Sequence, residues 1–237
     1  MPFANTAMTQ ASSAWHLFTR LGEAQILLPA MAAALLWLVL VARTPRLAAW
    51  WLGATAAAAA LTTATKVAFF GYEVGYAPLD YTGISGHAMF AAAVLPVLAG
   101  LLAGGAALRS RRAAVAAGYL LAASIAYSRL RVGAHSPVEA VAGLALGSLA
   151  SGLALWAPPL PAMRPPAWLA VGLALWVLSL PVGAPPSPTH GWVIRLSMAV
   201  SDRAQPYSRH AMHRDHRREL KRQRAAQLSA SARPTLH

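Results

Sequence analysis

The chain has 237 residues, of which 57% are hydrophobic and only 11% are charged, and it contains no cysteine. Ordinary soluble domains have about 45–50% apolar and about 25% charged residues, so this composition excludes a disordered chain and argues against a water-soluble globule. Without cysteine there is no disulfide framework, no thiolate nucleophile and no thiolate-ligated metal centre.

The net charge of +13 is unevenly distributed along the chain. Ten of the 20 basic residues follow residue 184, between Arg195 and Arg233, and the others lie mostly in short gaps between apolar runs. A nucleic-acid-binding domain would carry its basic residues on a folded face and would lack long apolar runs. We therefore expect no nucleic-acid partner, and we predict that residues 184–237 form a basic, partly disordered tail that touches anionic lipid.

Six apolar runs are each close to the roughly 20 residues that a helix needs to cross the hydrocarbon core of a bilayer. In chain order they are Ile26–Ala42, Leu47–Ala64, Ala88–Leu108, Ala113–Tyr127, Val138–Ala157 and Ala167–Val182. Residues 1–25 carry a single arginine, Arg20, so we interpret the first run as an uncleaved span rather than a signal peptide. The predicted fold is an all-α, polytopic membrane bundle of about six helices, with its transmembrane domain over residues 26–183.

The gaps between the spans differ in charge. Three alternate gaps carry arginine and no acid, and they contain Arg43 and Arg46, then Arg109, Arg111 and Arg112, then Arg164. The positive-inside rule makes these gaps cytoplasmic, which leaves residues 65–87 and 128–137 on the outer face together with both termini. Abundant alanine and arginine with little lysine is typical of a GC-rich bacterial source. We therefore predict a bacterial inner membrane protein whose outer gaps face the periplasm.

The ionisable residues of the apolar region gather in the two outer gaps. Between residues 26 and 183, apart from arginine, they are Lys66, Glu73, Asp80, His87, His135 and Glu139. Ionisable groups near membrane spans are costly and tend to be functional. Their distribution predicts a shared polar site at the outer membrane surface.

Two features suit this site to a phosphate group. Ser85-Gly86-His87 leads directly into an apolar run, and glycine at a helix N-terminus lets an anion approach the free backbone N–H groups. Lys66 and Arg129 add an ammonium charge and a guanidinium fork, both of which bind phosphate. No H-E-x-x-H or similar ligand spacing occurs, so we expect neither a metal nor another cofactor.

Together these residues resemble the type 2 phosphatidic acid phosphatase (PAP2) superfamily, which shares its active site with vanadium haloperoxidases and bacterial acid phosphatases. The family pattern runs K-x6-R-P, P-S-G-H and S-R-x5-H-x3-D. This chain has Lys66, then Ser85-Gly86-His87, then Ser128-Arg129-x5-His135-x3-Glu139. The resemblance covers about residues 60–150 and points to the membrane-bound branch, whose motifs lie on outward loops of a helical bundle.

The resemblance implies a role for each matching residue. His135 is the nucleophile that forms a phosphohistidine, Glu139 orients and stabilises its ring, and His87 is the general acid. The phosphoryl oxygens are held by Lys66, Ser85, Gly86 and Arg129. Glu139 also has a purely structural interpretation, because Ser136-Pro137-Val138-Glu139 matches a helix capping box, and the two roles can coexist.

Three positions depart from the family pattern. Ile84 replaces the proline of the second motif, and Glu139 replaces the aspartate of the third, which keeps the carboxylate but adds a methylene. Glu73 replaces the arginine of the first motif, and this removes a phosphate clamp. We hypothesise that Arg131 supplies the missing charge. Glu73 and Asp80 either orient a cation of the site or are merely solvated.

The function implied by the resemblance is that of an integral membrane lipid phosphatase. It would hydrolyse a phosphomonoester or diphosphate of a membrane lipid through a phosphohistidine, without a metal. Two alternatives stay open. One is a non-catalytic membrane protein that binds an anionic lipid, which the Glu73 departure favours, and the other is a lipid phosphotransferase on the same scaffold.

Overall fold

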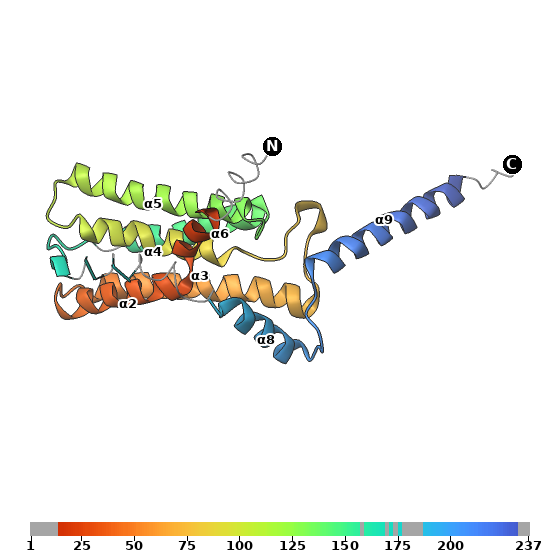
Figure 1. Ribbon diagram of the computed structural model, residues 1–237, viewed down its shortest axis with the longest axis horizontal. Helices are drawn as coiled ribbons and strands as arrows, with labels where there is room; N and C mark the ends of the chain where they lie inside the picture. The colour runs from red at the N-terminus through yellow and green to blue at the C-terminus, as the bar shows by residue number, and fades with distance from the viewer. Residues whose placement is uncertain (1–13, 157–158, 169–170, 173–174, 177–186, 232–237) are drawn as a thin grey trace, which may run out of the picture.

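Every regular element in the described part of the chain is a helix, which confirms the predicted all-α class. The computed structural model describes residues 14–156, 159–168, 171–172, 175–176 and 187–231. Its helices are α2 (Ala24–Leu40), α3 (Pro45–Tyr72), α4 (Gly86–Leu102), α5 (Leu108–Arg131), α6 (Pro137–Trp156), α8 (Thr189–Ser201) and α9 (Arg209–Ser231). In Figure 1, α2 to α6 lie side by side along one axis, and α9 projects beyond one end of them.

Four helical stretches of the described chain are long and apolar enough to cross a membrane, and a fifth is apolar but shorter. The four are Ala14–Leu40, Pro45–Tyr72, Leu108–Arg131 and Pro137–Trp156, and the shorter one is Gly86–Leu102. These five correspond to the first five predicted spans. Their ends differ by several residues. Helix α3 continues past its apolar run to Tyr72 and so includes Lys66, whereas α4 ends at Leu102, before the predicted end of its run at Leu108. The sixth predicted span, Ala167–Val182, falls mostly outside the described residues.

Helix α4 is the centre of the bundle. Six of its residues between Ala88 and Val94 have no exposed surface. Gly143 and Gly147 of α6 face it, and a Cβ atom on either would overlap the backbone carbonyl oxygen of Ser85 or Met89. Small residues therefore bring the backbones of α4 and α6 into direct contact, as in other membrane helix pairs. This contact fixes the start of α4 beside the start of α6.

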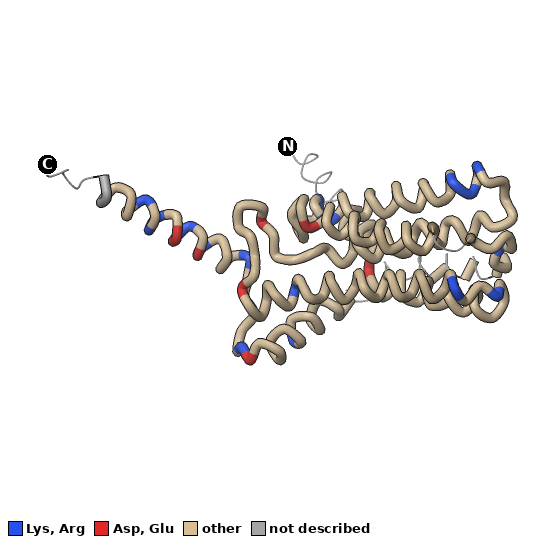
Figure 2. Tube along the Cα trace, turned by 180° about the vertical axis from the view of Figure 1, so that it is seen from behind, with Lys and Arg blue, Asp and Glu red and all other residues tan. Residues whose placement is uncertain are grey.

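The two ends of the bundle carry different charges. The connections α2–α3 and α4–α5 lie at one end. Arg43 lies in the first connection, Arg46 in the first turn of α3, and Arg109, Arg111 and Arg112 at the start of α5, and all are predicted to be cytoplasmic. The connections α3–α4 and α5–α6 lie at the other end, near Glu73, Asp80 and Glu139. Figure 2 shows basic residues at the first end and acidic residues only toward the second and along α9, among the residues described.

Two described segments that follow α6 lie at opposite ends of the bundle. Arg111 donates to the carbonyl oxygen of Pro161, and Arg164 donates to that of Gly104, so this segment begins at the arginine-rich end. Thr189, by contrast, lies at the opposite end and lines a cavity with His87. The described residues on either side of the sixth predicted span therefore lie at opposite ends of the bundle.

The described part of the segment after residue 184, expected to be a partly disordered tail, forms α8 and α9. Helix α8 packs on the last turns of α3, where a Cβ on Gly71 would lie 3.0 Å from the carbonyl oxygen of Ser197. Beyond α8, the N–H of Tyr207 donates to the carbonyl oxygen of Phe70 at 2.9 Å. The Tyr207 and Phe69 rings lie 5.4 Å apart. The segment is thus docked on the end of the bundle that holds residues 65–87.

Candidate active site

His135 and Glu139 form a hydrogen-bonded pair at the start of α6. The Nδ1 atom of His135 lies 2.7 Å from Oε2 of Glu139. The same oxygen accepts from the N–H of Ser136 at 3.1 Å, and the N–H of Glu139 donates to Oγ of Ser136 at 3.4 Å. The two interpretations of Glu139 are therefore compatible, because one carboxylate both closes the capping box and holds the histidine ring.

The remaining partners of Glu139 come from distant parts of the chain. Thr82 donates to Oε1 from its N–H and from its hydroxyl, each at 2.6 Å. Arg209 donates to Oε1 at 2.9 Å and to Oε2 at 2.8 Å. The Glu139 side chain is 0% exposed. A buried charge needs such partners, and these donors replace the water that the carboxylate has lost.

Glu139 determines which ring nitrogen of His135 is free. An ionised carboxylate can only accept, so Nδ1 carries the proton and Nε2 keeps its lone pair. Burial lowers the pKa of His135, and the hydrogen bond with Glu139 opposes that shift without cancelling it. At neutral pH the ring is therefore neutral and can act as a nucleophile through Nε2.

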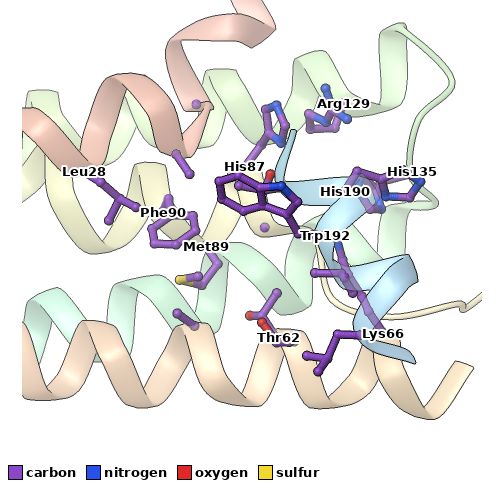
Figure 3. A pocket seen from close by; sticks show the side chains of 18 residues that line it. Leu28, Thr62, Lys66, His87, Met89, Phe90, Arg129, His135, His190 and Trp192 are labelled. Carbon is purple, nitrogen blue, oxygen red and sulfur yellow. The ribbon is translucent and has the colours of Figure 1, made fainter. Parts of the chain in front are cut away.

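Cationic and histidine side chains line the polar end of a cavity of about 350 Å³. Figure 3 shows them converging from different elements: Lys66 from α3, His87 from α4, Arg129 from α5, His135 from the loop before α6 and His190 from α8. A Cβ on Gly86 would lie 3.9 Å from Nζ of Lys66. The lysine and the N-terminus of α4 thus approach the same point, as expected of a site that surrounds an anion.

Three donors near this point are buried without a protein partner, and one of them is Oγ1 of Thr62, on the wall of the same cavity. The other two are Nε of Arg129 and Oγ of Ser85, although Nη1 of Arg129 donates to Oγ1 of Thr19 at 2.9 Å. Buried donors without acceptors are uncommon in folded proteins. The free donor of Arg129, on the cavity wall, suits a ligand that brings its own acceptor oxygens. Ser85 lines none of the described cavities, and its N–H donates to the carbonyl oxygen of Glu139 at 3.1 Å.

The opposite, apolar end of the same cavity lies among the membrane-spanning helices. Its walls come from α2, α3, α4 and α8 and include Leu28, Ala59, Phe90, Trp192 and Leu196. Figure 3 shows Leu28, Met89 and Phe90 on this side, away from Arg129 and His135. A second cavity of about 500 Å³ reaches His135 from beneath the C-terminal segment, where Tyr207 and Arg209 line it. The site is therefore amphiphilic, with a cationic end and an apolar end.

Three predicted assignments differ from what the structure places at the site. Arg131, our candidate for the missing charge, is exposed at the end of α5 and lines none of the described cavities. Glu73 forms an ion pair with Arg203 at 2.5 Å, and Asp80 pairs with Arg209 and His213. These two acids therefore hold the C-terminal segment rather than Lys66 or Arg129.

Sequence reasoning missed three residues that line or support the site: Thr82, His190 and Arg209. Thr82 lies in the outer gap but belongs to no recognised motif. His190 and Arg209 belong to the segment that charge alone marked as a tail. Their one sequence signal is that His190 lies only eight residues after the end of the last predicted span at Val182, on the side where the predicted topology already placed the site.

Comparison with known proteins agrees with this geometry. A family model described as PAP2 superfamily matches residues 54–160. A Klebsiella pneumoniae protein, described as an uncharacterized 22.5 kDa protein in the cps region, is 43% identical over 142 residues. That match covers 60% of this chain and 68% of the relative. No solved structure matches the chain significantly.

Proposed function

This chain belongs to the PAP2 superfamily, and from that premise we propose that it is a membrane lipid phosphatase acting through a phosphohistidine on His135. The observation that carries this proposal is the amphiphilic cavity. Nε2 of His135, the side chains of Lys66 and Arg129 and a helix N-terminus stand at one end, and an apolar groove leads away between membrane-spanning helices. A phosphorylated lipid has the same two parts.

The first step transfers the phosphoryl group to the enzyme. Nε2 of His135 attacks phosphorus and forms the N–P bond as the P–O bond to the lipid breaks. His87, on the same cavity, donates a proton to the leaving oxygen. Glu139 holds the ring and stabilises the positive charge that it gains.

The second step returns the enzyme to its starting state. Water attacks phosphorus, His87 accepts its proton, and the N–P bond breaks with release of inorganic phosphate. In both steps the negative charge on the phosphoryl oxygens is met by Lys66, Arg129 and the N–H groups that begin α4. Side chains and backbone supply every group, so the mechanism requires no metal or other cofactor.

The distribution of arginine supports an orientation in the membrane. The arginine-only loops lie at the end of the bundle opposite the site. The positive-inside rule places that end in the cytoplasm. For a bacterial inner membrane, the site would then face the periplasm, and a lipid headgroup in the outer leaflet would reach it.

The test measures phosphate release from a panel of lipid phosphates by the full chain in detergent with EDTA. The panel includes phosphatidic acid, phosphatidylglycerol phosphate, a polyprenyl diphosphate and a lipid A phosphate. We expect release that survives EDTA, is abolished in His135→Ala and is unchanged in His210→Ala, an exposed histidine on α9. Labelled phosphate should be trapped on His135 after an alkaline quench, since phosphohistidine is labile in acid.

The alternatives give different results in the same assay. A phosphotransferase would release little phosphate until an acceptor lipid is added, and would then move the label to that lipid. A binding protein would retain labelled lipid without releasing or trapping phosphate, and that result would overturn the phosphatase proposal.

A further inference from the structure

The C-terminal segment between α8 and the first turns of α9 lies across the site end of the bundle and meets three carboxylates there. Arg203 pairs with Glu73, and His213 lies 2.6 Å from Oδ1 of Asp80. Arg209 pairs with both Asp80 and Glu139. Among these contacts, only that of Arg209 with Glu139 reaches the predicted catalytic residues.

Packing as well as charge holds the segment in place. Asp202 ends α8 in the left-handed conformation with φ of 53°, which turns the chain back toward the bundle. Tyr207 then hydrogen-bonds to the last turn of α3. Met212 is 5% exposed, and its sulfur would lie 2.7 Å from a Cβ on Gly75. Arg209 thus lies between Tyr207 and Met212, which are both fixed by contacts with the bundle end.

Arg209 provides the charge compensation that Glu139 needs. The other contacts of the carboxylate come from Thr82, Ser136 and His135, and none of these carries a permanent positive charge. Within the described residues, Arg209 is the one permanent cation that contacts this fully buried side chain. An unpaired buried carboxylate tends to take up a proton, and it would then no longer hold Nδ1 of His135 as an acceptor.

We propose that Arg209 is a positioning residue, whose guanidinium keeps Glu139 ionised and aligned with His135, so that the C-terminal segment is part of the active site. The inference rests on the proposed phosphohistidine mechanism. The segment lies outside residues 54–160, which the PAP2 family model matches. It also accounts for two acids of the outer gap, since Glu73 and Asp80 anchor the segment that carries Arg209.

The shape of the guanidinium fits this role better than an ammonium group would. One Nη of Arg209 donates to Glu139 and to the hydroxyl of Thr82 at 3.0 Å. The other Nη donates to the carbonyl oxygen of Asp80 at 2.9 Å and to its carboxylate. A planar fork can serve both acids at once, whereas a lysine has a single nitrogen on a flexible stem.

The experiment follows the protonation of His135 directly. Diethyl pyrocarbonate acylates only neutral imidazole, so its reaction with His135 as pH varies, read by peptide mass spectrometry, reports the neutral fraction. The charged and titratable groups that face His135 are Lys66, His87, Arg129, Glu139, His190 and Arg209. Of these groups only Arg209 is substituted, and the experiment uses the full chain in detergent.

In Arg209→Gln we expect the midpoint of labelling to fall by about one pH unit, because a Glu139 that takes up a proton no longer stabilises the imidazolium of His135. The acidic limb of kcat/KM should move with it. Arg203→Gln is the matched control, since it removes an arginine of the same segment that does not contact Glu139. Its midpoint should equal that of the wild type. An unchanged midpoint in Arg209→Gln, or an equal shift in Arg203→Gln, would overturn the proposal.

Arg209→Lys keeps the positive charge but removes the planar guanidinium, so it tests whether the shape of the side chain matters. It also serves as the test of the proposal if Arg209→Gln does not fold. We expect kcat to fall by about 10-fold to 100-fold with little change in KM, because the ring of His135 is misaligned while lipid binding is intact. Full activity in Arg209→Lys would overturn the proposal. If the wild type releases no phosphate but the labelling midpoint still shifts in Arg209→Gln, the phosphatase function fails and the positioning role stands.

Discussion

The two ends of the helical bundle use arginine in different ways. At the end with the arginine-only loops, Arg111 donates to the carbonyl oxygen of Pro161, and Arg164 donates to that of Gly104. At the end with the site, Arg203 and Arg209 pair with carboxylates, and Arg129 lines a cavity and has a buried Nε without a protein partner. Arginine therefore donates to backbone carbonyl oxygens at one end of the bundle and pairs with carboxylates at the other.

The acids and histidines account for this difference. Helix ends and irregular segments leave carbonyl oxygens that need donors, and Arg111 and Arg164 supply them without any acid nearby. Where Glu139 and His135 are present, the same guanidinium group becomes a charge partner. Loops with arginine but no acid therefore mark the end of the bundle away from the site. Carboxylates together with histidines mark the site itself. The following predictions test that contrast, from the largest effect to the smallest.

Replacing Glu139 should cause the largest loss. In Glu139→Gln the amide can donate to Nδ1 of His135, which stabilises the tautomer whose Nε2 is protonated and cannot attack. We expect kcat to fall by about 10⁴-fold. Glu139→Asp restores the carboxylate one methylene shorter and should lose only about 10-fold. Phosphate release under saturating lipid measures both, and equal losses in the two variants would contradict the role of the carboxylate.

The pH dependence should reflect the burial of His135. Its pKa is lowered from the ordinary value of 6.5, and the ring must be neutral to attack. As pH falls, kcat/KM should therefore persist below pH 6.5 and then drop about tenfold per pH unit once the lowered pKa is passed. The pH profile of kcat/KM on the best lipid measures this. An acidic midpoint at or above 6.5 would show that burial does not control the nucleophile.

Gly147→Ala should separate the two helices that carry the site. The added Cβ would overlap the carbonyl oxygen of Met89 on α4, so α4 and α6 must move apart. We expect a loss of about 1–3 kcal/mol in unfolding free energy, together with reduced activity. Gly152→Ala on the same helix meets nothing within 4 Å and is the matched control. Thermal unfolding followed by tryptophan fluorescence compares them, and an equal melting temperature would argue against the close contact.

Arg111→Gln at the opposite end should have the smallest effect. It removes the donor to the carbonyl oxygen of Pro161 and should cost about 1 kcal/mol of stability. We expect kcat and KM to be unchanged, because no group of the site lies at that end. Arg112→Gln, an exposed neighbour, should change neither stability nor activity. A large loss of activity in Arg111→Gln would break the division between the two ends.

Local spacing made part of the site predictable. His135 and Glu139 are four residues apart across the start of a helix, so one turn brings them together whatever the rest of the chain does. Lys66, His87 and Arg129 could be assigned by their motifs and by the predicted topology, which put their gaps on one side of the membrane. The apolar runs in the same way determined the helical class, because a membrane span must satisfy its backbone within one helix.

Tertiary structure alone decided the rest. Arg129 and Arg131 are two residues apart on α5, about 200° around the helix, so only one can face the cavity, and the sequence did not show which. Arg209 is 70 residues from Glu139, and nothing in a run of basic residues marks one as the partner of a buried acid. The sequence by itself determined an all-α membrane bundle, and it predicted a histidine–carboxylate pair at a proposed phosphate site. Which distant side chains complete that site depended on the docking of α8 and the segment after it, since long-range pairing is set by packing and not by spacing.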